Sequence, residues 1–177
     1  AMSSQVSGDL SKIEGSACKV TYKGTACGHT EGGVTLSAKP KVREVKVDEY
    51  GDTVADLVYT GDDFTVRARF TEKSTQVIQT AYQFGGRIHA SLWGIGKLPG
   101  TRGQSLGGPL LLHPLDGDGV KDDVLLHKAV VRDTADVGFG SYMNDRMWDV
   151  TFQALIDETV SGDRLLGQIG VSAATFV

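Results

Sequence analysis

Basic side chains are scarce in this sequence of 177 residues, which has 18 lysines and arginines against 22 aspartates and glutamates and a formal net charge of −4. A protein that binds nucleic acid through its phosphates needs clustered lysine and arginine. This mild excess of acid therefore argues against a nucleic-acid-binding protein. It suits a surface that repels DNA.

Cysteine is also rare, and Cys18 and Cys27 are the only two. Two thiols in a cytoplasmic product are more often reduced than bridged. Together with His29 they lack a fourth ligand and the usual zinc spacings. We therefore expect free thiols near a hairpin.

Long apolar runs are missing. No run approaches the roughly 20 residues needed to cross a bilayer. The polar start at Met2 lacks the basic and apolar regions of a signal peptide. We expect a soluble protein, made in a cytoplasm and without a membrane partner.

Motifs for catalysis are missing as well. The histidines have no G-x-S-x-G motif beside them, and no pair has the i, i+4 spacing of a metalloprotease helix. The acidic turn with Asp116, Asp118, Asp122 and Asp123 is like the start of a calcium loop, but Val120 stands at a ligand position and no glutamate closes the loop. We predict no enzyme, no catalytic residue, no cofactor and no metal. A metal-dependent enzyme built on this turn is the weaker alternative.

Glycine is plentiful, with 23 residues, and apolar and polar side chains alternate over several stretches. This pattern predicts a mainly β fold of about seven to nine strands, as a sandwich or barrel-like sheet. The surest strand is 64–71, with Arg67 and Arg69 on its polar face. We expect a flexible arm at 1–16 and a single domain at 17–177. The other expected strands are 18–22, 34–38, 42–47, 110–115, 124–131, 148–154 and 165–171.

Two hairpins are expected, one from 18–22 with 34–38 and one from 110–115 with 124–131. Between Glu49 and Asp63 the alternation loosens into polar residues and glycine, which predicts a long loop. Compact domains seldom carry such loops without a use, and a binding contact is the usual one. The predicted contact residues are Tyr50, Asp52, Thr53, Asp56 and Tyr59.

One helix is expected from Thr75 to Phe84, because Ser74 can cap its first turn and the Gly85-Gly86 pair can end it in the left-handed conformation. The glycine-rich segment 94–108 is expected to be a loop. Its expected apolar anchors are Trp93, Ile95 and Leu98. Trp148 is expected in the core.

The order of several phrases resembles one protein family. The similarity covers most of the chain, from roughly Gly33 to Gly170, and its phrases are moderately specific only as a set. They are Val45-Lys46-Val47-Asp48-Glu49-Tyr50-Gly51-Asp52-Thr53, Thr60-Gly61-Asp62-Asp63-Phe64-Thr65-Val66, Leu110-Leu111-Leu112-His113-Pro114-Leu115, Asp123-Val124-Leu125-Leu126-His127-Lys128-Ala129, Asn144-Asp145-Arg146, Trp148-Asp149-Val150-Thr151-Phe152-Gln153-Ala154 and Arg164-Leu165-Leu166-Gly167-Gln168-Ile169-Gly170. In this respect the chain is similar to the tail-tube proteins of long-tailed bacteriophages.

The resemblance implies a β-sandwich flanked by one helix, which forms hexameric rings whose sheets join into an inner barrel. The rings would stack through the loop at 49–63 and the arm at 1–16, and double-stranded DNA would pass through the lumen without specific binding. The implied partners are other copies of the chain and the tape-measure, terminator and baseplate or tip proteins. The implied location is the virion tail, assembled in the host cytoplasm.

Arg67 and Arg69 fit an acidic lumen poorly. They are expected either to line the pore or to pair with acidic residues of a neighbouring subunit, and pairing is favoured. Two other functions remain open. One is a tube subunit of a phage-like contractile or secretion apparatus, and the other is a glycan-binding β-sandwich for host attachment that uses Trp93.

Overall fold

The computed structural model of the chain describes residues 17–89, 92–115, 123–137, 146–160 and 166–170. These residues form a mainly β protein with antiparallel sheets and two short helices, so the predicted fold class is confirmed at this level. The predicted arm at 1–16 and the turn at 116–119 lie outside the described residues.

The elements follow one another in this order along the chain: β1 (Cys18–Tyr22), β2 (Thr25–Ala26), β3 (Thr30–Lys46), the 3-10 helix η2 (Asp48–Tyr50), β4 (Val54–Phe70), α1 (Thr75–Ala81), β5 (Gly86–His89), β6 (Leu92–Gly94), α2 (Gly103–Leu106), β7 (Gly108–Pro114), β8 (Val124–Thr134), β9 (Trp148–Ala154) and β10 (Gly167–Ile169).

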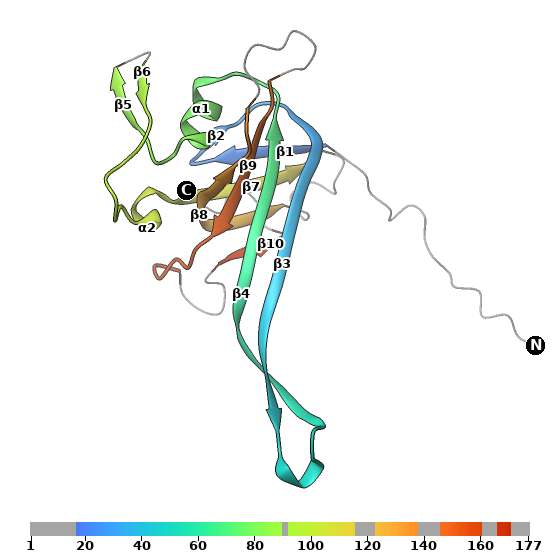
Figure 1. Cartoon of the computed structure of the whole chain (residues 1–177). Helices are drawn as coiled ribbons and strands as arrows, with labels where there is room; N and C mark the ends of the chain where they lie inside the picture. The colour runs from blue at the N-terminus through green and yellow to red at the C-terminus, as the bar shows by residue number, and fades with distance from the viewer. Residues whose placement is uncertain (1–16, 90–91, 116–122, 138–145, 161–165, 171–177) are drawn as a thin grey trace, which may run out of the picture.

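The main sheet has the strand order β2-β1-β7-β8-β9-β4-β3, and β10 pairs with β8 beside this path. Strands β5 and β6 form a separate hairpin. In Figure 1, β1, β7 and β8 run across the direction of β3 and β4, because the sheet twists strongly along its width. Buried residues from both ends of the sheet, such as Val20 of β1 and Val66 of β4, belong to one core cluster.

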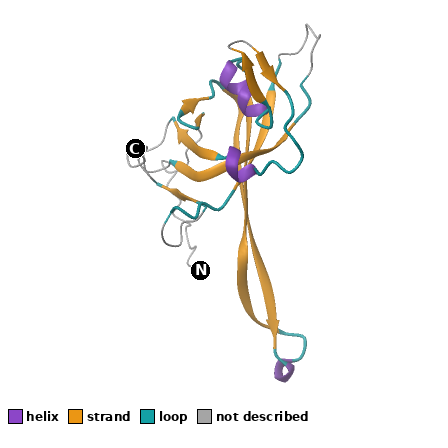
Figure 2. Ribbon diagram, turned by 90° about the vertical axis from the view of Figure 1, so that its left-hand side faces the viewer, coloured by secondary structure: helices purple, strands orange, loops and turns teal. Residues whose placement is uncertain are grey.

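Buried apolar side chains from both halves meet in this core. The ring of Tyr22 on β1 lies 5.2 Å from that of Phe152 on β9. Helix α1 covers one side with Val77 and Ala81, as Figure 2 shows beside the strands. The predicted core position of Trp148 is confirmed, since it is 3% exposed.

Most predicted strands are confirmed, because each buries one face. Strand β9 alternates strictly between buried and half-buried residues. In β4, Val66, Ala68 and Phe70 are buried, whereas Arg67 and Arg69 are exposed. The hairpin of β7 and β8 is confirmed by its antiparallel register. Strand β10 confirms the last predicted strand over residues 167–169.

The first predicted hairpin was wrong. Strand β1 pairs with β2 and β7, whereas β3 pairs with β4 over its whole length. Lys23 and Gly24 both have positive φ, and this tight turn sends the chain back after Tyr22 into the two-residue strand β2. The sequence pattern marked the strands correctly but did not identify their partners.

Helix α1 begins where predicted, because the side chain of Ser74 accepts a hydrogen bond from the N–H of Val77. It ends three residues early, at Ala81, and Gly85 and Gly86 do not adopt positive φ. Segment 94–108 is mostly loop, as predicted, but contains the one-turn helix α2.

Candidate functional site

Strands β3 and β4 continue beyond the body of the protein as a two-stranded arm, residues 39–63 (Figure 1). The sequence predicted a long loop at 49–63, and this was wrong. Only the tip is not strand, since the turn ends at Thr53 and β4 begins at Val54. Among the predicted contact residues, Tyr50, Asp52 and Thr53 lie in the tip, whereas Asp56 and Tyr59 lie on β4.

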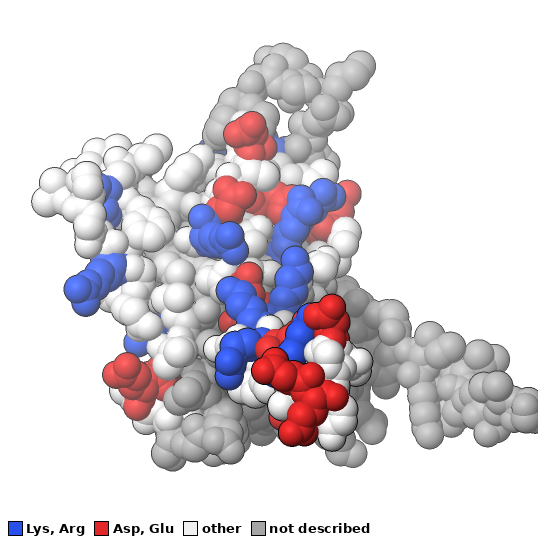
Figure 3. Space-filling model, turned by 60° about the horizontal axis from the view of Figure 1, so that its bottom comes forward, with Lys and Arg blue, Asp and Glu red and all other residues white. Residues whose placement is uncertain are grey.

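The tip is a compact turn. The N–H of Tyr50 donates to the carbonyl of Val47 over 3.0 Å, and the N–H of Thr53 donates to the carbonyl of Tyr50 over 3.3 Å. Gly51 has φ of 63°, a conformation that glycine adopts without steric cost. Figure 3 shows acidic side chains gathered at the front of the arm and basic ones behind them. The acidic residues of the tip are Asp48, Glu49 and Asp52.

The arm has one apolar and one charged face. Residues directly opposite each other on antiparallel strands point to the same side. On one side Val42 pairs with Tyr59 and Glu44 with Leu57, and the three apolar side chains are 52–59% exposed. The other side carries charged pairs such as Lys39 with Asp63. The apolar face continues the core face of the sheet, and nothing in the described chain covers it.

The outer edge of β3 is open. This strand is the last in the sheet order, so its 17 residues are paired on one side only among the described residues. Pro40 has no N–H to donate, and charged Lys39 and Lys41 flank it. Open edges pair readily with other chains, and lysine and proline restrict such pairing. The sheet therefore has an unpaired edge here, and the part of β3 before Lys39 is the part suited to pairing.

Arg67 and Arg69 both bind one carboxylate, that of Asp149 on β9. Nε of Arg67 donates to Oδ1 over 2.8 Å, and Nε of Arg69 donates to Oδ2 over 3.2 Å. The Arg67 guanidinium is the main cause that lowers the pKa of Asp149, and Arg69 adds to it. The two arginines are thus partly neutralised within their own chain. The sequence showed that Asp149 lies on a polar strand face, but not that β9 lies beside β4.

The closest histidine–carboxylate pair among the described residues is that of His113 and Asp123. Nδ1 of His113 on β7 lies 2.5 Å from Oδ1 of Asp123, whose residue is 1% exposed. Cys18 lies nearby, but burial raises the pKa of its thiol, whereas an activated nucleophile needs a lowered pKa.

Among the described residues, no group of three His, Cys, Asp or Glu side chains is placed to hold a metal ion. The remaining members of the predicted acidic turn, Asp116, Asp118 and Asp122, lie outside these residues.

Trp93 anchors the β5–β6 hairpin to the body, since its indole N–H donates to the carbonyl of Tyr82 over 3.0 Å. Its ring is half-buried and lines a cavity of about 330 Å³ that also contains Gln76 and Gln79. The two other predicted anchors were wrong, because Ile95 and Leu98 are 77% and 84% exposed. Both cysteines are free, as predicted.

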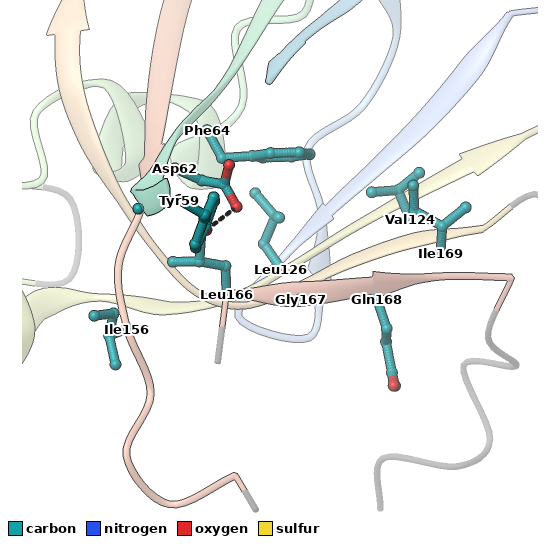
Figure 4. Close-up of a pocket in the computed structure, with 11 residues that line it drawn as sticks. Tyr59, Asp62, Phe64, Val124, Leu126, Ile156, Leu166, Gly167, Gln168 and Ile169 are labelled. Atoms are coloured by element: carbon teal, nitrogen blue, oxygen red, sulfur yellow. Dashed lines mark hydrogen bonds between the residues drawn. The ribbon is translucent and has the colours of Figure 1, made fainter. Parts of the chain in front are cut away.

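A larger cavity of about 670 Å³ opens between the root of the arm and β10, and we call it the mouth. Figure 4 shows Phe64 of β4 above it, Leu126 of β8 in the middle and Ile156 on one side. At the rim the hydroxyl of Tyr59 donates to Asp62 over 2.5 Å. The lining is mostly apolar and comes from four separate stretches of the chain, so no local sequence pattern indicates this cavity. Its other lining residues are Gly61, Val124, Leu166, Gly167, Gln168 and Ile169.

A scan against models of protein families and a search of curated proteins both gave no match to this sequence. None of the described helices is long and apolar enough to cross a membrane.

Proposed function

We propose that this chain is a structural subunit that polymerises as stacked hexameric rings into the tail tube of a long-tailed bacteriophage. Double-stranded DNA would leave the capsid through the lumen. The subunit would perform no catalysis and would need no cofactor. Its partners would be other copies of itself and the tape-measure, terminator and baseplate or tip proteins, within the virion tail.

One observation carries this proposal: β3 is at once the open edge of the sheet and one half of the projecting arm. An open edge fits lateral joining of sheets into a barrel, which removes the edge. A projecting arm fits contact with a copy beyond the ring. Buried residues from both ends of the sheet share one core, which supports the sandwich form that the resemblance implies.

The arm supplies the proposed contact between rings. We assign this contact to the tip, where Tyr50 is 66% exposed next to an acidic turn. Tyr59 and Asp56 on the stem would extend it along the arm. An exposed aromatic ring of this size is typical of residues that dominate protein interfaces.

The charge of the chain is compatible with a DNA conduit. A pore that binds phosphates firmly would retain DNA, because each contact adds attraction. Asp149 binds Arg67 and Arg69 on the polar face of β4 and so weakens the attraction of these two arginines for phosphate. A net charge of −4 also favours repulsion of DNA by the assembled surface.

The proposal can be tested by shortening the arm. Val42 and Tyr59 are direct partners, so residues 43–58 can be replaced by Asn-Gly, the two-residue turn that keeps this register. The body should keep its melting temperature, because the deleted residues are exposed or half-exposed. Negative-stain microscopy and light scattering should show rings or tubes for the full chain and none for the shortened one.

Two results would contradict the proposal. One is tubes of unchanged form from the shortened chain. The other is a full-length chain that stays monomeric at high concentration and also in the presence of tail-tip proteins that initiate assembly. Tyr50→Ser keeps the arm and removes only the aromatic ring of the tip, so it should also reduce assembly. Leu115→Ser, at an exposed position outside the arm, is the control and should assemble like the full chain.

A further inference from the structure

Two apolar surfaces of the described chain remain uncovered apart from the arm. The first is the mouth. The second, which we call the hairpin patch, lies on the β5–β6 hairpin and the loop after it. It consists of Ile88, Leu92, Ile95 and Leu98, which are 68%, 55%, 77% and 84% exposed. Clusters of exposed apolar side chains usually mark sites of association.

The hairpin that carries Ile88 and Leu92 is held against the body. The bond from Trp93 to Tyr82 ties the hairpin to the end of α1. A Cβ atom at Gly85 would lie 2.3 Å from the carbonyl oxygen of Gly94, so only glycine allows this close approach. The patch is therefore presented by a supported hairpin on the side of the body away from the arm (Figure 1).

The mouth is large enough to receive apolar side chains of the hairpin patch. Its volume of about 670 Å³ is several times the ~150 Å³ of an apolar cavity that admits a benzene ring. Ile169 and Ile156 at its sides are 68% and 49% exposed. These two side chains remain in water in the described chain and would be covered by an occupant.

The charges around the two surfaces are opposite. From Ser74 to Leu115 the sequence contains no aspartate or glutamate. The segment around the patch carries Arg87, Lys97 and Arg102. The rim of the mouth and the residues just after Ile156 are acidic, with Asp62, Asp157 and Glu158. Opposite charges around two apolar surfaces favour their association and oppose contact of either surface with itself.

We propose that the hairpin patch of one copy docks into the mouth of a second copy. The inference rests on the self-association in the proposed function, and it names the surfaces involved. The two surfaces differ, so the contact is heterologous: each copy receives one neighbour and enters another. Such a contact builds a ring when it closes and a filament when it does not.

Cross-linking between two different chains tests this contact. One chain carries Ile95→Cys and a tag that changes its mass, and the other carries Ile169→Cys. Both also carry Cys18→Ser, while Cys27 stays because it is buried. A short bis-maleimide is added to the mixture, in assembled tubes when they form and in concentrated solution otherwise. The matched control replaces Ile169→Cys with Leu115→Cys, which is 60% exposed and lies outside both surfaces.

The expected result is at least about tenfold more mixed dimer than in the control, because docking holds the two thiols at a high effective concentration. Equal yields overturn the inference. If tubes form and the test and control give equal yields of mixed dimer, the proposed function stands without this contact. If the cross-link is strong but no tube forms, the contact is supported and the tube loses support. A second pair of substitutions, Ile88→Asp with Leu98→Asp, should abolish the excess. Both residues are exposed, so circular dichroism should show an unchanged fold.

Discussion

Nε of Arg67 on β4 donates to Oδ1 of Asp149 on the neighbouring strand β9 over 2.8 Å. The same carboxylate also binds Arg69, two residues along β4. A single acidic side chain thus holds two basic ones on the outer face of the sheet. Its loss should change how this face interacts with DNA.

Asp149→Asn should increase binding to double-stranded DNA. The change frees two guanidinium groups on one face, and unpaired arginines bind phosphates. Electrophoretic mobility shift at low salt should show the gain, and added salt should remove it. Asp136→Asn is the control, since it makes the same charge change at an exposed site. Equal binding by both variants would show that Asp149 does not restrain the arginines.

The Arg67–Asp149 pair should also give a pH-dependent stability. The pKa of Asp149 lies below its ordinary value of 3.8, mainly because of Arg67. The carboxylate therefore stabilises the fold above about pH 4 and loses this effect as the pH falls through the lowered pKa. The wild-type protein should have a higher melting temperature than the Asp149→Asn variant at pH 7, and the two melting temperatures should converge once the pH is below the lowered pKa of Asp149. A gap in melting temperature that stays constant over this range contradicts the assignment.

Gln83→Leu should destabilise the fold. This buried side chain accepts a hydrogen bond from the N–H of Val131 and donates to Leu106 and to the hydroxyl of Tyr22. Leucine would leave the buried N–H of Val131 without a partner, which costs about 1–3 kcal/mol. Urea unfolding monitored by tryptophan fluorescence measures the loss. Gln79→Leu, at a half-buried position on α1, should have a much smaller effect.

Cys27 should be unreactive in the native protein. Burial is the main cause that raises the pKa of its thiol to about 11, so the thiolate is scarce at neutral pH. In a Cys18→Ser variant, iodoacetamide at about pH 8 should label Cys27 only after denaturant is added. Mass spectrometry gives the labelled fraction over time. Rapid labelling without denaturant would mean that the core around Cys27 opens easily.

The strands that could be predicted are those with one buried face. In β9 and in residues 64–70 of β4, apolar side chains alternate with polar ones because water lies on one side of the strand only. The arm was missed for the opposite reason. From Val54 to Asp62 every residue but Gly61 is exposed, so the sequence is under no pressure from the chain's own core to alternate. Propensity alone did not distinguish this stretch from a loop.

Pairing between distant segments was beyond the sequence. Strand β1 pairs with β7, about ninety residues later, and no local signal encodes that choice. The same limit applies to Asp149 and to the mouth, whose residues come from separate strands. The sequence marks Arg67 and Arg69 as a poor fit to an acidic surface and predicts that they pair with acidic residues, but only the fold shows that Asp149 of the same chain binds both.

In the proposed tube, the arm would also have a consequence for the kinetics of growth. A ribbon of two strands with water on both faces is marginally stable by itself. Much of its order should therefore be acquired upon docking, and the first contacts between free subunits should be slow. Later subunits meet an acceptor that is already ordered and add faster. Turbidity during assembly should accordingly show a lag, which preformed seeds should abolish.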